Sequence, residues 1–251
     1  MLPATSLIPI RDENPTRSFS YLTVGLIAVN VLLFFTEPGF GQVTSEAALR
    51  FLFRWGVVPW EITHGRVVSI SECAGACAPG KNIYFALLSS MFLHGGFLHL
   101  AGNMLFLWVF GNNIEDTLGR VRYVTFYLVT GLAAGMAHVL TNPGSIIPTL
   151  GASGAISGVL GAYIVLFPRA RVHSIVPGFF LWTVNLPAVA VLGIWFFSQF
   201  FIGAGQQAGG AGVAWMAHVG GFVAGVITVF LLGGRQKARD VYPYRREPEP
   251  W

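Results

Sequence analysis

Long apolar runs separated by short polar links dominate the pattern along this chain. Six runs approach or reach the roughly 20 mostly apolar residues that a helix needs to cross a bilayer. They cover residues 19–35, 86–110, 123–140, 150–167, 186–202 and 213–232. A further apolar stretch, 175–184, is interrupted by Pro177 and followed by Pro187, so we interpret it as an interfacial or re-entrant entry to the fifth run. The pattern predicts an all-α membrane protein with six spans.

Composition supports the same class of protein. Hydrophobic residues make up 54% of the chain and charged residues only 10%, against about 25% in an ordinary globular protein. The surplus apolar surface is expected to face lipid. The first 20 residues do not have the pattern of a signal peptide, so the first apolar run is expected to remain as a span.

Basic residues predict the orientation. Eleven of the fifteen Lys and Arg residues lie before the first run, in the links 2–3 and 4–5, or after the sixth run, and the other four lie in one long loop. The positive-inside rule then places both termini in the cytoplasm. The expected parts are a cytoplasmic tail at 1–18, a membrane domain at 19–232 and a cytoplasmic tail at 233–251. Short tails favour a bacterial inner membrane, and the scattered positive charge gives no reason to expect a nucleic-acid partner.

The long outer loop, residues 36–82, contains an amphipathic segment in which aromatic residues alternate with Arg50 and Arg54. This pattern is typical of a segment that lies in the membrane interface with its tryptophans at headgroup level. Cys73 and Cys77 are able to pair in an oxidising compartment or to stay free, and their spacing does not decide between the two.

Acidic residues are scarce within the apolar runs, where several classes of membrane protease would need a carboxylate. Between residues 82 and 239 the only carboxylates are Glu115 and Asp116, at the cytoplasmic end of the second run. A paired-aspartate protease, a zinc protease of the HExxH type and a Ser-His-Asp triad each need a carboxylate in the site. The sequence excludes all three.

Polar residues inside the apolar runs are costly and are therefore functional candidates. At about 1.5 Å of rise per residue, four of them fall at a similar depth near the outer face: His99, Asn103, Ser153 and His218. Small residues at four-residue spacing follow Ser153 and His218, and such faces let helices approach closely. The two side chains are expected within hydrogen-bonding reach, although a lone serine in such a helix is more often a packing residue.

The other histidines favour simpler interpretations. His138 is interpreted as a hydrogen-bonded packing residue. His94 and His99 lie about 140° apart around a regular helix, which makes them a poor metal pair. We predict no metal and no cofactor; binding by His94, His99 and His218 would require an irregular start to the second run.

Three motifs then occur in order on helices of matching direction: His94-x4-His99-x3-Asn103, Gly151-Ala152-Ser153-Gly154 and Ala217-His218-x2-Gly221-x3-Gly225. Together with the string GNNIEDTLGR at 111–120, they resemble the rhomboid family of intramembrane serine proteases, of the bacterial type. The resemblance covers roughly residues 85–232.

The resemblance implies a six-span bundle whose short fourth helix carries the nucleophile below a water-filled cavity. Ser153 would be the nucleophile and His218 its general base. His99, Asn103 and the Ser153 N–H would form the oxyanion hole, with His94 and Gly151 shaping the site. At the position four residues after the nucleophile, the family often has an aromatic residue, but here it is Ser157. The His218 ring is therefore expected to rely on other neighbours, such as Trp215.

The substrate of such an enzyme would be a single-span membrane protein that enters from the lipid as an extended segment, because a helix hides its backbone carbonyls. The aromatic fifth run, with Trp195 and Phe196, is a candidate lateral gate; the alternative is a lipid-facing aromatic surface. Two other classes of protein compete with the enzyme. One is a non-catalytic relative that binds membrane proteins, which would be expected to lack the serine or the histidine. The other is a metal transporter, which the scarcity of carboxylates disfavours.

Overall fold

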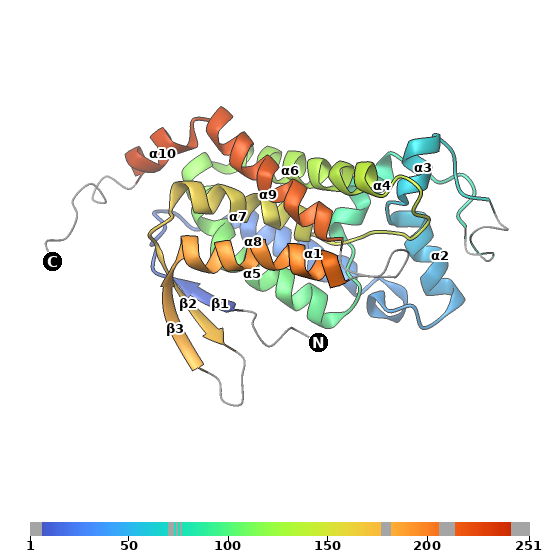
Figure 1. The fold of residues 1–251 in the computed structure, drawn as a ribbon, viewed down its shortest axis with the longest axis horizontal. Helices are drawn as coiled ribbons and strands as arrows, with labels where there is room; N and C mark the ends of the chain where they lie inside the picture. Colours follow the sequence, from blue (N-terminus) through green and yellow to red (C-terminus); the bar gives the residue numbers. More distant parts are fainter. Residues whose placement is uncertain are drawn as a thin grey trace, which may run out of the picture.

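The computed structural model describes residues 7–69, 73, 75, 77–176, 182–205 and 214–241. Within this part, the chain is mostly helical, as predicted. The long helices are α1 (Tyr21–Phe34), α5 (Phe97–Leu118), α6 (Arg120–Thr141), α7 (Ser153–Leu166), α8 (Ala188–Gly205) and α9 (Trp215–Leu231). They run along the long axis of the molecule, with shorter helices at one end and a small sheet with α10 (Gly234–Val241) at the other (Figure 1).

Five of the six predicted runs correspond to one helix each, but the second does not. The predicted run 86–110 is divided between α4 (Phe85–Ser89), the short helix η2 (Ser90–Phe92) and α5, and the two parts meet at 90°. Gly96 adopts φ +133°, a conformation that residues with a side chain rarely adopt, so the turn before α5 depends on glycine. Helix α5 also continues to Leu118, eight residues beyond the predicted end.

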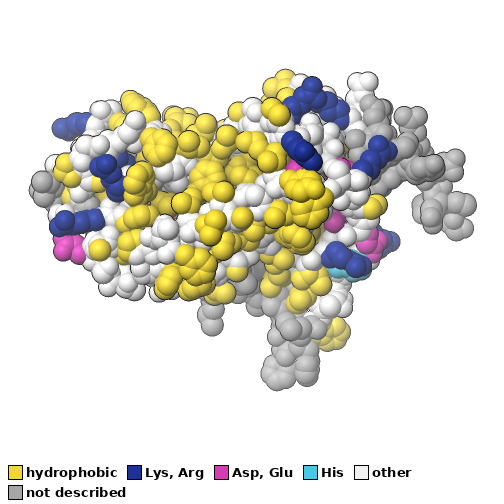
Figure 2. Space-filling view, turned by 180° about the vertical axis from the view of Figure 1, so that it is seen from behind, with side chains coloured by type: hydrophobic (Ala, Val, Ile, Leu, Met, Phe, Trp, Pro, Cys, Tyr) yellow, Lys and Arg dark blue, Asp and Glu magenta, His cyan; other side chains and the backbone are white. Residues whose placement is uncertain are grey.

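Helix length alone supports fewer spans than the sequence pattern does. Among the described helices, α6 is long and apolar enough to cross a bilayer, and the bent pair Phe85–Phe92 and Phe97–Leu118 would make a second span. Helices α1, α7 and α9 and the segment Ala188–Phe201 are apolar but shorter. The face in Figure 2 is covered by hydrophobic side chains along its middle, with Lys and Arg near both ends.

Three strands correct the all-α prediction. β1 (Ile8–Asp12), β2 (Arg171–Val176) and β3 (Trp182–Pro187) form an antiparallel sheet in the order β1-β2-β3. Parts of the expected tail 1–18 and of the expected interfacial segment 175–184 are therefore strands. Val172 pairs with Leu186, and Ile8 pairs with Ile175. The sheet was missed because β1 and β2 are more than 150 residues apart, and a strand's partner cannot be deduced from its own pattern.

The two carboxylates of α5 have structural partners at this end of the molecule. Glu115 accepts hydrogen bonds from the backbone N–H groups of Leu22 and Thr23, at 3.1 and 2.8 Å. Asp116 accepts from the N–H groups of Arg17 and Ser18. Backbone N–H groups at the start of a helix have no intrahelical partner, so Glu115 caps α1.

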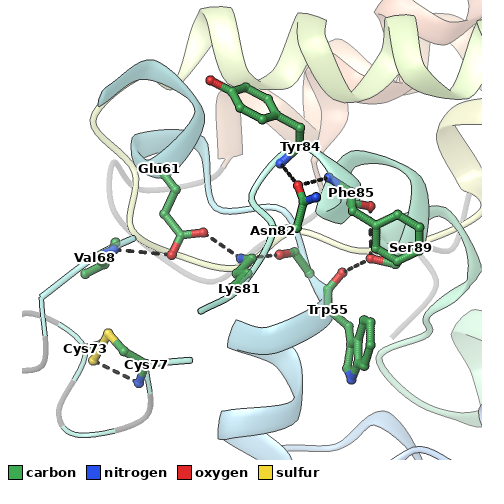
Figure 3. A network of polar contacts seen from close by, with 11 residues as sticks. Trp55, Glu61, Val68, Cys73, Cys77, Lys81, Asn82, Tyr84, Phe85 and Ser89 are labelled. Atoms are coloured by element: carbon green, nitrogen blue, oxygen red, sulfur yellow. Dashed lines mark hydrogen bonds and ion pairs between the residues drawn. A yellow bond between two sulfur atoms is a disulfide. The ribbon is translucent and has the colours of Figure 1, made fainter. Parts of the chain in front are cut away.

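The outer loop is folded at the opposite end, around α2 (Glu46–Trp55) and α3 (Pro59–His64). Lys81 and Glu61 form a buried ion pair at 2.6 Å, and Lys81 also donates to the Gly56 carbonyl (Figure 3). Burial lowers the pKa of Lys81. Cys73 and Cys77 are joined by a disulfide, which decides the question left open by their spacing.

Candidate active site

Ser153 and His218 are brought together at the start of two crossing helices. Ser153 is the first residue of α7, and His218 lies in the first turn of α9. The Ser153 Oγ and the His218 Nε2 are 2.7 Å apart, a hydrogen-bonding distance. The pairing expected from their depth is therefore present in the structure.

Glycines bring these two helices into contact. A methyl group added at Gly221 would overlap the Gly154 carbonyl, and one added at Gly225 would overlap the Gly158 carbonyl. The backbones therefore touch along two turns, which is the close approach that small residues at four-residue spacing permit. This packing fixes the position of Ser153 relative to His218.

The second nitrogen of His218 meets a residue to which the sequence assigned no role. The Gln199 Oε1 lies 2.7 Å from the His218 Nδ1, and Gln199 is buried. The ring beside His218 belongs to Trp195, with centroids 5.9 Å apart, whereas Trp215 contacts Phe200. Gln199 was visible in the sequence only as an amide in an otherwise apolar, aromatic run.

The segment before Ser153 is fixed by hydrogen bonds to two neighbours. The Gly151 N–H donates to the Ser90 carbonyl at 2.8 Å. Thr149 pairs with Val57 of the outer loop through two backbone hydrogen bonds, and its hydroxyl lies 3.0 Å from the His138 Nε2. His138 thus has the hydrogen-bonded packing environment expected for it, and it helps to hold the turn that leads to Ser153.

Gly151 leaves a space that the His99 ring and the Ser153 hydroxyl both border. A methyl group added there would lie 3.0 Å from the His99 Cε1, 3.1 Å from the His99 Nε2 and 3.3 Å from the Ser153 Oγ. The φ of Gly151 is +133°, which also favours glycine. A small cavity of about 30 Å³ adjoins the same region and is lined by Ser153, Gly131 and Met91, among others.

A hydrogen bond from the backbone of Gly95 determines the tautomer of His99. The Gly95 backbone N–H donates to the His99 Nδ1 at 3.2 Å, so this nitrogen is an acceptor and the proton of a neutral ring is on Nε2. That Nε2–H faces the space over Gly151. Asn103, one turn further along α5, is buried, and its Nδ2 has no protein partner among the described residues. The His99 Nε2–H is a donor available to an oxygen at this site, and the Asn103 Nδ2 is a further donor on the same helix that has no partner there.

His94 lies in the turn before α5 and not on the helix. It is fully buried, and its ring centroid is 5.3 Å from that of His99. Its backbone N–H donates to Glu37 at 3.1 Å, which ties the end of α1 to this turn. Burial raises the pKa of the Glu37 carboxyl to about 7. Within the described residues, no group of three or more His, Cys, Asp or Glu side chains is placed to hold a metal.

The structure also places Ser157 and the two candidate gate residues of α8. The Ser157 hydroxyl donates to the carbonyl of Ser153 and contributes no ring beside His218. On α8, Trp195 and Phe196 both pack against Phe222 of α9, whereas Phe201 is exposed. The two candidate gate residues therefore face the bundle, and the exposed aromatic surface is carried by their neighbours.

A serine paired with a histidine, with further donors beside it, is the arrangement of a serine hydrolase site. Residues 81–235 match the model of the Rhomboid domain. Because this match covers more than half of the chain, the protein belongs to the rhomboid family.

Individual relatives support the same family assignment. The chain is 31% identical over 151 residues to "Rhomboid protein 1, mitochondrial" of Saccharomyces cerevisiae, which covers 57% of this chain and 40% of that protein. It is 27% identical over 224 residues to "Rhomboid protease GluP" of Bacillus subtilis, covering 88% of this chain and 36% of that protein. It is 30% identical over 165 residues to "Rhomboid-like protease 5" of Toxoplasma gondii, covering 64% and 17%. The chain spans less than half the length of each of these relatives.

Proposed function

We propose that this protein is an intramembrane serine endopeptidase that cleaves single-span membrane proteins near the outer face of the membrane. The observation that carries the proposal is the 2.7 Å contact between the Ser153 Oγ and the His218 Nε2. A serine hydroxyl is a weak nucleophile until an adjacent base takes its proton. A non-catalytic relative would have no need of this pair.

In the proposed reaction, the Ser153 Oγ attacks the scissile carbonyl carbon, and its proton passes to the His218 Nε2. The carbonyl oxygen becomes an oxyanion and accepts hydrogen bonds from the His99 Nε2–H, the Asn103 Nδ2–H and the Ser153 backbone N–H. The last of these has no intrahelical partner, because Ser153 is the first residue of α7. Each such donor is typically worth about 2.7–4 kcal/mol of transition-state stabilisation.

The intermediate then collapses as the C–N bond breaks. His218 gives its proton to the leaving amine, and an acyl-enzyme ester remains on Ser153. Water, deprotonated by His218, attacks this ester; the C–O bond to Ser153 then breaks, His218 returns its proton to the Ser153 Oγ, and the new carboxyl end is released. No cofactor or metal has a role in these steps.

The proposed substrate enters from the lipid as an extended segment. The small cavity beside Ser153 suits a small side chain next to the scissile bond. Helix α8 is the candidate lateral gate, and a cross-link between α8 and α5 would then prevent cleavage of membrane substrates. Unchanged turnover in the cross-linked enzyme would show that the substrate enters elsewhere.

The proposal includes a six-span bundle at 19–232, with cytoplasmic tails at 1–18 and 233–251 and the loop 36–82 outside. The Cys73–Cys77 disulfide supports an outer position for this loop, because disulfides persist in oxidising compartments. A bacterial inner membrane is the proposed location.

Labelling by a fluorophosphonate probe tests the proposed nucleophile without a known substrate. The Ser153 Oγ would form a bond to phosphorus, fluoride would leave and His218 would take the proton. We expect labelling of the wild type at Ser153 and none in Ser153→Ala. Folded wild-type protein that does not label, in detergent or in lipid, would favour the non-catalytic binding protein instead.

A further inference from the structure

The orientation of His218 depends on a contact from α8 that a serine–histidine pair alone does not explain. The His218 Nε2 faces Ser153, and the Nδ1 of the same ring lies 2.7 Å from the Gln199 Oε1. Gln199 is 3% exposed, so its amide is removed from competing partners. An unsatisfied amide at this depth would be costly, and each of its atoms therefore needs a partner.

The other end of the amide fixes which atom faces the histidine. The Gln199 Nε2 lies 3.0 Å from the Trp195 carbonyl oxygen, which can only accept a hydrogen bond. It also lies 3.2 Å from the Ser198 Oγ, whose own proton is donated to the Trp195 carbonyl. A rotated amide would place two acceptors against each other, so the Oε1 must point toward His218.

The tautomer of His218 follows directly. An amide oxygen is an acceptor, so the Nδ1 that it faces must carry a proton. In the neutral ring, the Nε2 is then unprotonated and is free to accept the proton of Ser153. We infer that Gln199 is the orienting residue of a Ser153–His218–Gln199 triad, in which a neutral amide takes the place that a carboxylate has in other serine hydrolases.

This inference rests on the proposed function and makes it more specific. It accounts for the absence of a carboxylate from the described site, and it supplies the support for His218 that Ser157 does not provide. Gln199 does not touch the reacting atoms, so it is a positioning residue. Its loss should lower the turnover step and leave substrate binding unchanged.

Replacement of Gln199 by residues of similar length separates an orienting role from a packing role. Gln199→Met keeps the volume but removes the strong acceptor, whereas Gln199→Glu keeps an acceptor at the same place. The measurement is the rate of fluorophosphonate labelling of Ser153 in the full-length protein in lipid. A general base typically contributes about 10²–10⁴-fold, and we expect Gln199→Met to lose roughly 10- to 100-fold of that. Gln199→Glu should label faster than Gln199→Met.

A packing role predicts the reverse order, because a methionine suits an apolar site better than a buried carboxylate does. Folded Gln199→Met that labels at the wild-type rate, or faster than Gln199→Glu, would overturn the inference. Gly193→Ala is the matched control on α8, since an added methyl group there meets no atom within 4 Å; it should label like the wild type.

A second measurement requires no change at Gln199. In ¹⁵N spectra of the histidine-labelled protein, the His218 signals, assigned by their loss in His218→Ala, should show a protonated Nδ1 and an unprotonated Nε2. The opposite tautomer would overturn the inference even if the Gln199 variants fail to fold. Failure of the proposed function itself looks different: the wild type would not label, or Ser153→Ala would still label.

Discussion

At the scale of single residues, the candidate site depends on the contacts that a few side chains and glycines make. Gly151 is the clearest case, because its lack of a side chain leaves the space between His99 and Ser153 open. His99 presents its Nε2–H to this space because the Gly95 N–H occupies its Nδ1. Asn103 brings a second donor from the same helix. In the proposed mechanism, a substrate carbonyl that reached Ser153 would place its oxygen here.

Gly151→Ala should therefore abolish activity. The added methyl group would lie within 3.3 Å of both the His99 ring and the Ser153 Oγ, and the backbone there disfavours any side chain. Loss of the oxyanion contacts typically lowers kcat by about 10²–10³-fold for each donor. The control is Gly102→Ala, beside Asn103 on α5, where an added methyl group has open space. Equal turnover of both variants would show that this space is not used.

Glu37 gives the outer end of the protein a dependence on pH. Burial raises the pKa of its carboxyl to about 7, above the ordinary value of 4.5, although the hydrogen bond from His94 opposes the rise. The folded protein therefore holds the proton more tightly than the unfolded chain does. The contribution of protonated Glu37 to the free energy of unfolding is complete below about pH 4.5. It is lost as the pH rises through 7, at up to about 1.4 kcal/mol per pH unit.

Thermal unfolding of the wild type and Glu37→Gln between pH 5 and 8 measures this effect. We expect the melting temperature of the wild type to fall with pH more steeply than that of the variant, which cannot ionise at this position. Parallel curves for the two proteins would contradict the assignment.

The sequence allowed us to predict which polar residues matter, but it did not allow us to predict how their side chains are oriented. Polarity and depth singled out Ser153, His218, His99 and Asn103 as candidates, because polar side chains are rare in apolar runs, and the family resemblance supplied their expected roles. Gln199 was equally conspicuous, but its role depends on the rotation of α8 against α9, which no local pattern contains. The place of His94 in a turn depended on the break at Gly96, within a run that reads as continuously apolar.

Among the helices, the crossing of α7 and α9 matters most for the site. The glycine pairs Gly154–Gly221 and Gly158–Gly225 let the two backbones touch, so that their first turns meet at the dyad. The Gln199–His218 bond adds α8 to this group. Any opening of α8 as a gate must therefore preserve the position of Gln199, or it disorients the base.

Gly225→Ala tests the helix crossing two turns away from the dyad. The new methyl group would overlap backbone atoms of Gly158, and overpacking of this kind typically costs about 1–3 kcal/mol. We expect a lower melting temperature together with slower labelling of Ser153. Gly25→Ala, where an added methyl group on α1 meets nothing within 4 Å, should behave like the wild type. Normal stability of Gly225→Ala would mean that the helices do not pack this closely.

The outer loop is held by the Glu61–Lys81 pair (Figure 3). Lys81→Met would leave Glu61 buried without its partner, and breaking a buried pair typically costs about 3–5 kcal/mol. The double variant Glu61→Leu with Lys81→Met removes both charges and should recover much of the loss in a denaturation experiment. Additive losses in the double variant would show that the two side chains do not interact.

For the whole molecule, the distribution of charge is compared with the proposed position of the protein in the membrane. Hydrophobic side chains cover the middle of the face in Figure 2, between ends that carry Lys and Arg. The outer loop with its disulfide lies at one end, and the sheet with α10 lies at the other (Figure 1). Such a polarity fits a bundle that spans the bilayer with the Ser153 site near the disulfide end.

Labelling of cysteines in intact cells tests this orientation. A cysteine placed at Arg50, an exposed side chain of the outer loop, should react with a membrane-impermeant maleimide without permeabilisation in a Cys73→Ser, Cys77→Ser background. A cysteine placed at Arg235, in a Cys73→Ser, Cys77→Ser background, should react only after the cells are permeabilised. The reverse pattern would invert the proposed topology.

Cleavage of a membrane-embedded peptide bond tests the central claim most directly. Purified protein in liposomes would be given a set of single-span reporters with small residues near the outer end of the span, and the products would be identified by mass spectrometry. The account predicts cleavage by the wild type and none by folded Ser153→Ala or His218→Ala. Equal cleavage by Ser153→Ala, or reporters bound but left intact by the wild type, would contradict it.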